Sequence, residues 1–308
     1  MSDLAWEIAY LEKNQNPTDS SGRVLSLISA QSSNLKDKDI QALANALKKN
    51  SVFKGGIRLD ENHLTDLGII YLIRALQVSE SSIDYLNLSF NNLKDRSGVY
   101  IGELLTQGYK LKELHLRGCC IENLGVQRIF ETLSISLLQI LDIGIVHNPG
   151  MHIIGKYLPR AKELKELILQ QGDPWDNMAI RAFISGMKDN ISILNLQIIN
   201  CENEEFIDEV QGITDRNRGF FEQGEVERQQ AQSLDPKVFA EEIQGYIENS
   251  IQNLPVRVYL SNSLGTLLND GVFQLMKFRF NEQNPSKNTA VNNIKWLIRF
   301  ILDKAKNS

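Results

Sequence analysis

The stretch LNLSFNNLKDRSG, residues 86–98, decides the fold of this chain. Leu86 and Leu88 alternate with polar residues, which is the two-residue period of a strand with one buried face, and after Asp95 the spacing becomes helical. Asn91 lies in the loop between them, where we expect its amide to satisfy buried backbone groups, since an unpaired one costs about 1–3 kcal/mol. One strand and one helix cannot close a core alone, so the unit should recur.

The unit does recur. Clear copies are GIRLDENHLTDLG from Gly56 and LKELHLRGCCIENLG from Leu111, in which Cys119 takes the position of the Asn. Weaker copies start at Leu27, Leu138, Leu164 and Ile191. The second strand residue of the six later units recurs at intervals of 26 to 29 residues, and such a period is typical of a solenoid.

The pattern L-x-x-L-x-L-x-x-N/C-x-L-x-x-x-G-x-x-x-L-x-x-x-L resembles the ribonuclease-inhibitor-like class of leucine-rich repeats. The match is best over residues 53–135 and looser over 24–218, about two thirds of the chain. The resemblance implies an α/β horseshoe solenoid with parallel strands on the concave face and helices on the convex face.

We expect four regions. Residues 1–22 form a capping helix, and 23–213 an array of about seven units. A polar, Gln-rich linker follows over 214–234. Residues 235–308 form an all-α module, which opens with an N-cap at Asp235 followed by proline.

Composition and charge exclude several classes of function. The 308 residues carry a net charge of -5 and contain no run of Lys or Arg, which argues against nucleic acid or an anionic membrane as the main partner. No apolar stretch reaches the ~18 residues of a membrane span, and no signal peptide is visible. The cysteines are odd in number, and two of them are adjacent in sequence, which does not suit a disulfide framework: Cys119, Cys120 and Cys201. We therefore expect reduced thiols and a cytoplasmic protein.

Catalysis is not expected. Residues 218–308 contain no Cys and no His, so neither a thioester nucleophile nor a Cys/His or Ser/His pair can form there. The histidines are His63, His115, His147 and His152. None has a partner at metal-ligand spacing, and no glycine-rich phosphate loop is present. We therefore predict no metal, no cofactor and no enzymatic activity.

Side chains that alternate with the core leucines should project from the concave face, and apolar loop residues should adjoin them. The predicted partner-binding residues are Arg58, Asp60, Tyr85, Asn87, Phe90, Glu113, His115, Arg117, Asp142, Glu166, Ile168, Gln170, Trp175 and Asn195. Two of them have open alternatives. His115 is either a recognition residue or a plain solvated strand residue, and Trp175 is either an exposed anchor or a core residue that replaces a missing ladder leucine.

The sequence therefore predicts a non-catalytic, monomeric recognition protein that binds a protein partner on its concave face. If the partner is an enzyme, the resemblance implies inhibition by covering the active site. The degenerate repeats, the Asn, Gln and Lys usage and the unrelated helical tail also resemble leucine-rich-repeat effectors that intracellular bacteria deliver into host cytosol without a cleavable signal peptide. The alternative is a regulator of a small GTPase, or an enzyme whose activity lies in the C-terminal helical domain.

Overall fold

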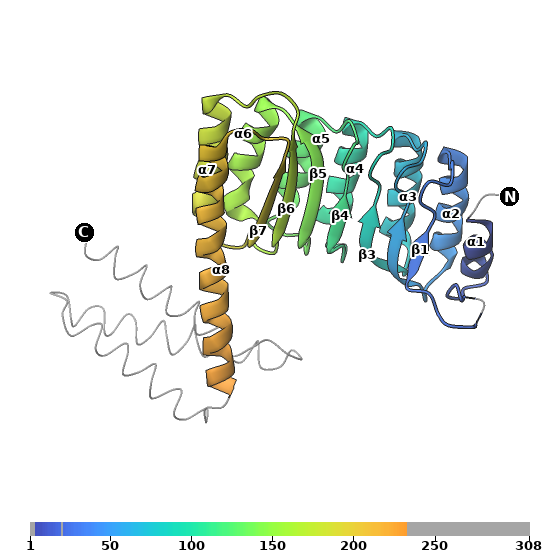
Figure 1. Cartoon of the computed structure of the whole chain (residues 1–308). Coiled ribbons are helices and arrows are strands. Elements are labelled where there is room, and N and C mark those ends of the chain that lie inside the picture. Colours follow the sequence, from blue (N-terminus) through green and yellow to red (C-terminus); the bar gives the residue numbers. More distant parts are fainter. Residues whose placement is uncertain (1–3, 20, 233–308) are drawn as a thin grey trace, which may run out of the picture. The chain divides into compact units, whose positions relative to one another are not determined.

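The structure is a computed structural model that describes residues 4–19 and 21–232. The chain divides into two compact units, Met1–Arg218 and Gly219–Ser308. The first unit contains all of the strands described below (Figure 1). The predicted all-α module at 235–308 lies outside the described residues.

Seven strands form one open sheet in which every neighbouring pair is parallel and the spatial order follows the sequence. They are β1 Leu27–Ser29, β2 Lys54–Arg58, β3 Ser82–Asn87, β4 Glu113–His115, β5 Ile140–Val146, β6 Glu166–Gln171 and β7 Asn195–Ile199. Each predicted unit contributes one strand, so the expected α/β solenoid is confirmed.

Helices α2 to α7 cover one face of this sheet (Figure 1). The helices are α1 Ala5–Glu12, α2 Asp37–Lys49, α3 Asp66–Val78, α4 Asp95–Thr106, α5 Asn123–Thr132, α6 Asn148–Tyr157 with the short 3-10 turn η1 Leu158–Arg160, α7 Asn177–Asp189 and α8 Glu204–Gln232. We call the other side of the sheet the open face. Among the helices of the described part of the chain, none has the length and apolar character that crossing a membrane requires.

The core lies between sheet and helices. Leu86, Leu88 and Leu93 of the opening stretch are fully buried there. Each contributes about 1.5–3 kcal/mol relative to an exposed position. The alternation read from the sequence therefore points its leucines toward the helices and its polar residues toward the open face.

Asn91 joins two repeats as predicted. Its Oδ1 accepts a hydrogen bond from the Leu64 N–H at 3.0 Å, and its Nδ2 donates to the carbonyls of Leu59 and Leu88, each at 2.9 Å. Asn62 makes the equivalent bonds one repeat earlier, accepting from Leu35 N and donating to Ala30 O. A ladder of buried amides thus satisfies the loop backbone from repeat to repeat.

A second ladder, not predicted, links the starts of the helices. The Asp66 carboxylate accepts from the backbone N–H groups of Lys94 and Ser97 at 2.9 and 3.1 Å. One repeat later, Asp95 accepts from the N–H groups of Glu122 and Gly125 at 2.9 and 2.8 Å. Helix N-termini leave N–H groups without an intrahelical partner, and here the preceding repeat supplies it.

Both ends of the array are covered. At the first, Leu4 and Leu11 are fully buried, while Trp6 stays 41% exposed. At the last, α8 buries Phe206 and Val210, which are one helical turn apart. The second end is therefore covered by α8, the helix that follows β7.

The region predicted as a linker is helical where the structure describes it. A polar connection was expected over 214–234, and its described part, to Gln232, belongs to α8. The apolar spacing that starts at Phe206 continues as a helix because buried Thr214 and Asn217 extend the packed stripe, and Asn217 Nδ2 donates to Ile193 O at 2.9 Å. The domain boundaries themselves stay a prediction.

Candidate functional site

Strand register places the side chains of the open face in two rows. The first row is Leu27, Gly56, Tyr85, Glu113, Ile140, Glu166 and Asn195, and the second is Ser29, Arg58, Asn87, His115, Asp142, Ile168 and Gln197. Adjacent strands lie about 4.8 Å apart, so neighbours within a row are in reach of one another. The predicted strand residues are thereby brought onto one surface.

The middle of these rows forms a cluster that we call the central patch, made of Arg58, Tyr85, Asn87, Glu113 and His115. His115 Nε2 lies 2.7 Å from Glu113 Oε1. The rings of Tyr85 and His115 are tilted by 49° with centroids 5.6 Å apart. All five residues are partly exposed. The patch is therefore ordered by its own contacts while still reachable from outside.

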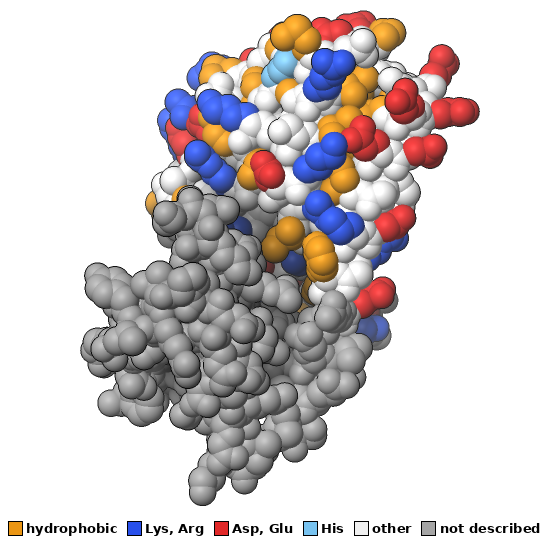
Figure 2. Space-filling model, turned by 90° about the vertical axis from the view of Figure 1, so that its left-hand side faces the viewer, with side chains coloured by type: hydrophobic (Ala, Val, Ile, Leu, Met, Phe, Trp, Pro, Cys, Tyr) orange, Lys and Arg blue, Asp and Glu red, His pale blue; other side chains and the backbone are white. Residues whose placement is uncertain are grey.

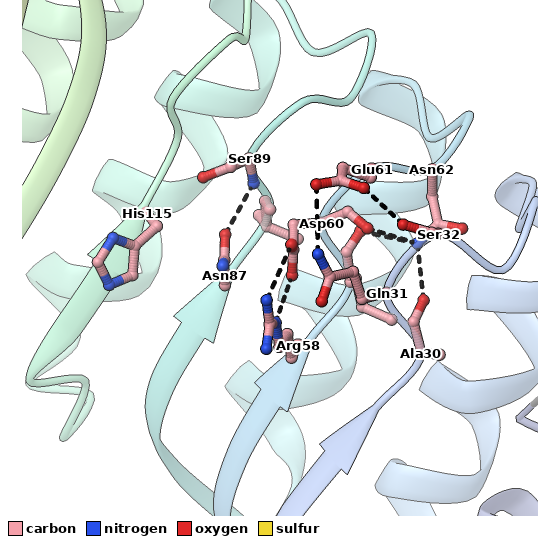
Figure 3. Close-up of polar contacts among 12 residues, drawn as sticks. Ala30, Gln31, Ser32, Arg58, Asp60, Glu61, Asn62, Asn87, Ser89 and His115 are labelled. Carbon is pink, nitrogen blue, oxygen red and sulfur yellow. Dashed lines mark hydrogen bonds and ion pairs between the residues drawn. The ribbon is translucent and has the colours of Figure 1, made fainter.

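Arg58 is held in the patch by Asp60. Its Nε donates to Asp60 Oδ1 at 2.9 Å and its Nη2 to Oδ2 at 3.4 Å, and this hydrogen bonding raises the pKa of Arg58 (Figure 3). Asp60 is only 4% exposed. The prediction that Asp60 contacts a partner is therefore wrong, because its carboxylate is covered and oriented toward the guanidinium.

Asn87 closes the end of β3. Its Oδ1 accepts from the Ser89 N–H at 3.0 Å (Figure 3). The same view shows Gln31 and Ser32 directed at the Glu61 carboxylate, with distances of 3.2 and 2.5 Å. Hydrogen bonds thus join the loops after β1 and β2, and the loop after β3 joins them through the Glu61 N–H, which donates to Ser89 O at 2.9 Å.

Asp142 is buried rather than available. It lies in register with His115, and its Oδ1 accepts from the Gly144 N–H at 3.1 Å. Burial raises the pKa of Asp142, against the lowering effect of Gly144, His115 and Arg117. The predicted partner contact is wrong here too, because the carboxylate is covered and accepts the hydrogen bond from its own strand.

Trp175 belongs to the core. It is 6% exposed, its Nε1–H donates to Val146 O at 2.8 Å, and its ring meets Phe206 edge to face at 5.8 Å. Its assignment as a binding residue is corrected, and the alternative that it folds inward holds. This repeat lacks the Asn-x-Leu frame, and the indole supplies both the missing bulk and the missing donor.

Phe90 occupies an unusual backbone position. Its φ is +55°, in the left-handed region that a bulky side chain rarely adopts, and the residue is 50% exposed. Glu61 has φ +56° at the same point of the preceding repeat, and Gly118 has φ +69° in the following one. A Cβ on Gly118 would lie 2.4 Å from the Phe90 ring, so this glycine makes room for the ring.

The remaining predicted residues flank the patch. Arg117 follows β4 and is partly exposed. Ile168 and Gln170 lie partly exposed on β6, and Glu166 accepts a hydrogen bond from Gln197 Nε2 at 2.9 Å. Asn195 is exposed at the start of β7. The predicted residues on β6 and β7 are separated from the central patch by β5.

The sequence reasoning missed one feature of the open face. A hollow of about 530 Å³ lies beside the starts of β2 to β4, with Lys54, Lys110 and Lys112 in its lining. The signal was Gly56, which stands where other repeats place a side chain, together with the nearby lysines. From the sequence, Gly56 was assigned no role beyond the start of a repeat copy.

The three cysteines differ in burial. Burial raises the pKa of Cys119 to about 11, and its Sγ lies 3.4 Å from Leu88 O, in the ladder position predicted for it. Cys120 is exposed. Within the described residues, no group of three or more His, Cys, Asp or Glu side chains is arranged to hold a metal ion.

Figure 2 shows the side of the molecule on which α7 and α8 lie in Figure 1. On the described part of this face, Lys and Arg side chains are interspersed with apolar and uncharged ones, and acidic side chains line the right-hand edge. The visible surface is of mixed charge.

A family model described as Leucine Rich repeat matches residues 110–130, which contain β4 and most of α5. A search of the curated proteins gives no match. Among solved structures, the chain is similar to "Leiomodin-1 Actin-Binding Site 2 (ABS2)", with 14% identity and a TM-score of 0.35, over 76% of this chain and 99% of that chain. The matched repeat and the parallel sheet together define an α/β leucine-rich-repeat solenoid.

Proposed function

We propose that this solenoid is a non-catalytic recognition module that binds a partner protein through its open face. The observation that carries the proposal is the central patch, where Arg, Tyr and His side chains from three adjacent strands meet on a partly exposed surface. Tyr and Arg are enriched among the residues that dominate binding energy at interfaces. Leucine-rich repeats are also a scaffold typical of protein binding, which agrees with the matched segment.

The order of the patch supports this proposal. Immobilising a flexible side chain on binding costs about 0.5–1.5 kcal/mol. The Glu113–His115 contact at 2.7 Å and the Arg58–Asp60 contact at 2.9 Å hold these side chains before a partner arrives. A preformed arrangement loses less entropy on binding, so the same contacts yield a higher affinity.

Phe90 extends the proposed interface to the strand ends. A bulky residue in the left-handed region costs on the order of 1–3 kcal/mol, and this strain persists only where the surroundings impose it. Here the result is an aromatic ring, half exposed, beside the loop that follows β4. We propose that the ring is a second apolar anchor for the partner.

The finer proposal is that binding inhibits or regulates the partner. A partner lying along the open face would have its own surface covered, which for an enzyme means a blocked active site. We also propose that the repeats are of the ribonuclease-inhibitor-like class, since a helix follows the strand in each regular repeat. A cytoplasmic, monomeric protein is part of the same proposal, and so is delivery as a bacterial effector into host cytosol; free thiols at Cys119, Cys120 and Cys201 agree with a reducing compartment.

The alternative functions place an activity elsewhere. An enzyme or a regulator of a small GTPase would need the region 235–308, which lies outside the described residues. No contact described above favours it.

The test compares partner capture by two matched double variants. Tyr85→Ala/His115→Ala removes the aromatic pair of the central patch, and Tyr100→Ala/His152→Ala removes the same residue types from α4 and α6 on the helical layer. Immobilised wild type and both variants are exposed to cytosolic lysate, and bound proteins are identified by mass spectrometry. We expect one or more proteins to be retained by wild type and the control and lost by the patch variant.

Matching thermal melts of the three proteins are required first, so that loss of capture cannot come from unfolding. Equal retention by all three would contradict the proposal and move binding away from the central patch. Loss in the control alone would assign binding to the helices.

A further inference from the structure

Two glycines, Gly55 and Gly56, line the hollow beside the starts of β2 to β4. A Cβ on Gly56 would lie 2.8 Å from Leu27 Cδ1 and 3.0 Å from Tyr85 Cδ1, so only glycine leaves room for these two side chains of its row neighbours, which also line the hollow. A Cβ on Gly55 would lie 2.0 Å from Ser26 O, which makes glycine necessary there for β1 and the start of β2 to approach. The floor of the hollow is therefore backbone.

Its walls are apolar. Leu27 is 40% exposed, which is unusual for a leucine in a repeat whose other leucines are buried. Tyr85 stands on the opposite side, partly buried, and this burial raises the pKa of its hydroxyl. Together they offer space and apolar surface for one side chain of a bound molecule.

Its rim is basic. Lys54, Lys110 and Lys112 line the hollow and are exposed, against a single acidic lining residue, Asp84. Within the part of the chain that the structure describes, none of the three lysines takes part in an ion pair. Three ammonium groups on an apolar depression create a local positive potential, although the whole chain has a net charge of -5.

We propose that this hollow binds an acidic segment of a protein partner, with one apolar side chain of the segment packed in the hollow against Leu27 and Tyr85 and flanking carboxylates against the lysines. The inference rests on the proposed function and adds the chemistry of the partner to it. A free anion would leave the apolar walls unused, and an uncharged apolar peptide would leave the lysines unpaired. An acidic peptide with one apolar residue complements both.

The experiment measures binding of fluorescent pentapeptides to the full chain by anisotropy. The probe is Glu-Asp-Leu-Glu-Asp, and Glu-Asp-Gly-Glu-Asp lacks the apolar side chain. Lys110→Glu/Lys112→Glu reverses the rim charge, and Lys38→Glu/Lys94→Glu makes the same change in net charge at the starts of α2 and α4, where acidic residues suit the helix dipole. All proteins must first show matching melts.

We expect saturable binding of the leucine peptide to wild type and to the control. The rim variant should bind at least about tenfold more weakly, and so should wild type with the glycine peptide. Raising the ionic strength from about 0.01 M to about 0.15 M should weaken binding, because the Debye length falls from about 30 Å to about 8 Å.

Three results would overturn the inference: no saturable binding, equal losses in the rim and control variants, or equal binding of the two peptides. The last would mean an anion site without an apolar component. Tyr85 belongs to both surfaces, but His115 does not line the hollow and the lysines lie outside the central patch, so the two proposals can be tested separately. Partner capture that depends on His115 would then leave the proposed function standing while the hollow is discarded.

Discussion

At the scale of single residues, Asn91 shows how the repeats are joined. Its amide serves backbone groups of two neighbouring units, and Leu64 N–H has no other hydrogen bond within the described residues. Asn91→Ala should lower the free energy of unfolding by about 1–3 kcal/mol, the cost of leaving a buried backbone group unpaired. Urea unfolding followed by circular dichroism measures it.

The neighbouring Asn92 provides the control for this prediction. Its side chain is exposed, so Asn92→Ala should change stability by no more than about 0.5 kcal/mol. Similar losses in the two variants would contradict the ladder as the source of stability.

Asp142 gives a pH-dependent prediction. Its pKa in the folded protein is raised above the ordinary value of 3.8 by burial, so its stabilising effect is complete below that value and is lost as the pH rises through the folded pKa. Where the pH is high enough to ionise the carboxylate, its burial costs stability. Asp142→Asn, which can still accept from the Gly144 N–H, should therefore raise the melting temperature at pH 7.

This gain should shrink as the pH falls and vanish below about pH 4, where Asp is protonated in both states. Thermal melts of both proteins from neutral to acidic pH measure the difference. An asparagine variant that is less stable at pH 7, or a gain that grows toward low pH, would show that the charges of His115 and Arg117 outweigh burial.

Residue roles were predictable where they depend on local pattern. The role of Asn91 follows from its place after a strand and recurs at Asn62 one repeat earlier. Asp60 and Asp142 were misassigned because alternation gives the face on which a side chain starts, whereas burial depends on neighbouring groups such as Arg58 and the irregular β5 backbone. The strain at Phe90 depends on a backbone angle that the sequence pattern does not contain.

At the scale of elements, α8 packs on the last complete repeat through aromatic side chains and not through the Asn ladder of the earlier repeats. Trp175, Phe183 and Phe206 meet edge to face, with ring centroids 5.8 and 5.9 Å apart. Aromatic pairs of this kind add about 0.5–1.5 kcal/mol beyond their buried area. The end of the array is thus held by aromatic packing where the Asn ladder has stopped.

Trp175→Phe tests this account. It keeps the aromatic packing and removes the Nε1–H bond to Val146 O, so stability should fall by about 1 kcal/mol, whereas Trp175→Ala should cost about 3–5 kcal/mol. Urea unfolding gives both values. Trp6→Ala, on the exposed side of α1, should cost much less. Equal costs at Trp6 and Trp175 would contradict the core assignment.

The strands and regular helices were predictable because their two periods differ and repeat many times. The extent of α8 was not, since a polar, Gln-rich stretch carries little apolar periodicity and its helix is imposed by packing at Thr214 and Asn217. Trp175 was ambiguous for a related reason, because Trp suits both a core and an interface. Neighbours distant in sequence decide such positions.

At the scale of the whole array, the stacking of repeats turns isolated positions into a surface. Each strand contributes one side chain to each row, and parallel register brings the Arg, Tyr, Asn, Glu and His of three strands together. The same register puts Gly56 in the first row between Leu27 and Tyr85, and all three line the hollow. In such a fold, the residues between the leucines form the exposed surface and so determine what it can bind.

The measurement that tests the central claim most directly is site-specific photo-crosslinking. A photoreactive phenylalanine derivative replaces Tyr85 in the central patch or, as the matched control, Tyr100 on α4. Each protein is illuminated in lysate containing the captured partner. The account predicts a covalent adduct with the partner from position 85 and none from position 100. An adduct from position 100 alone, equal adducts from both, or none from position 85 while the partner still co-purifies would contradict it.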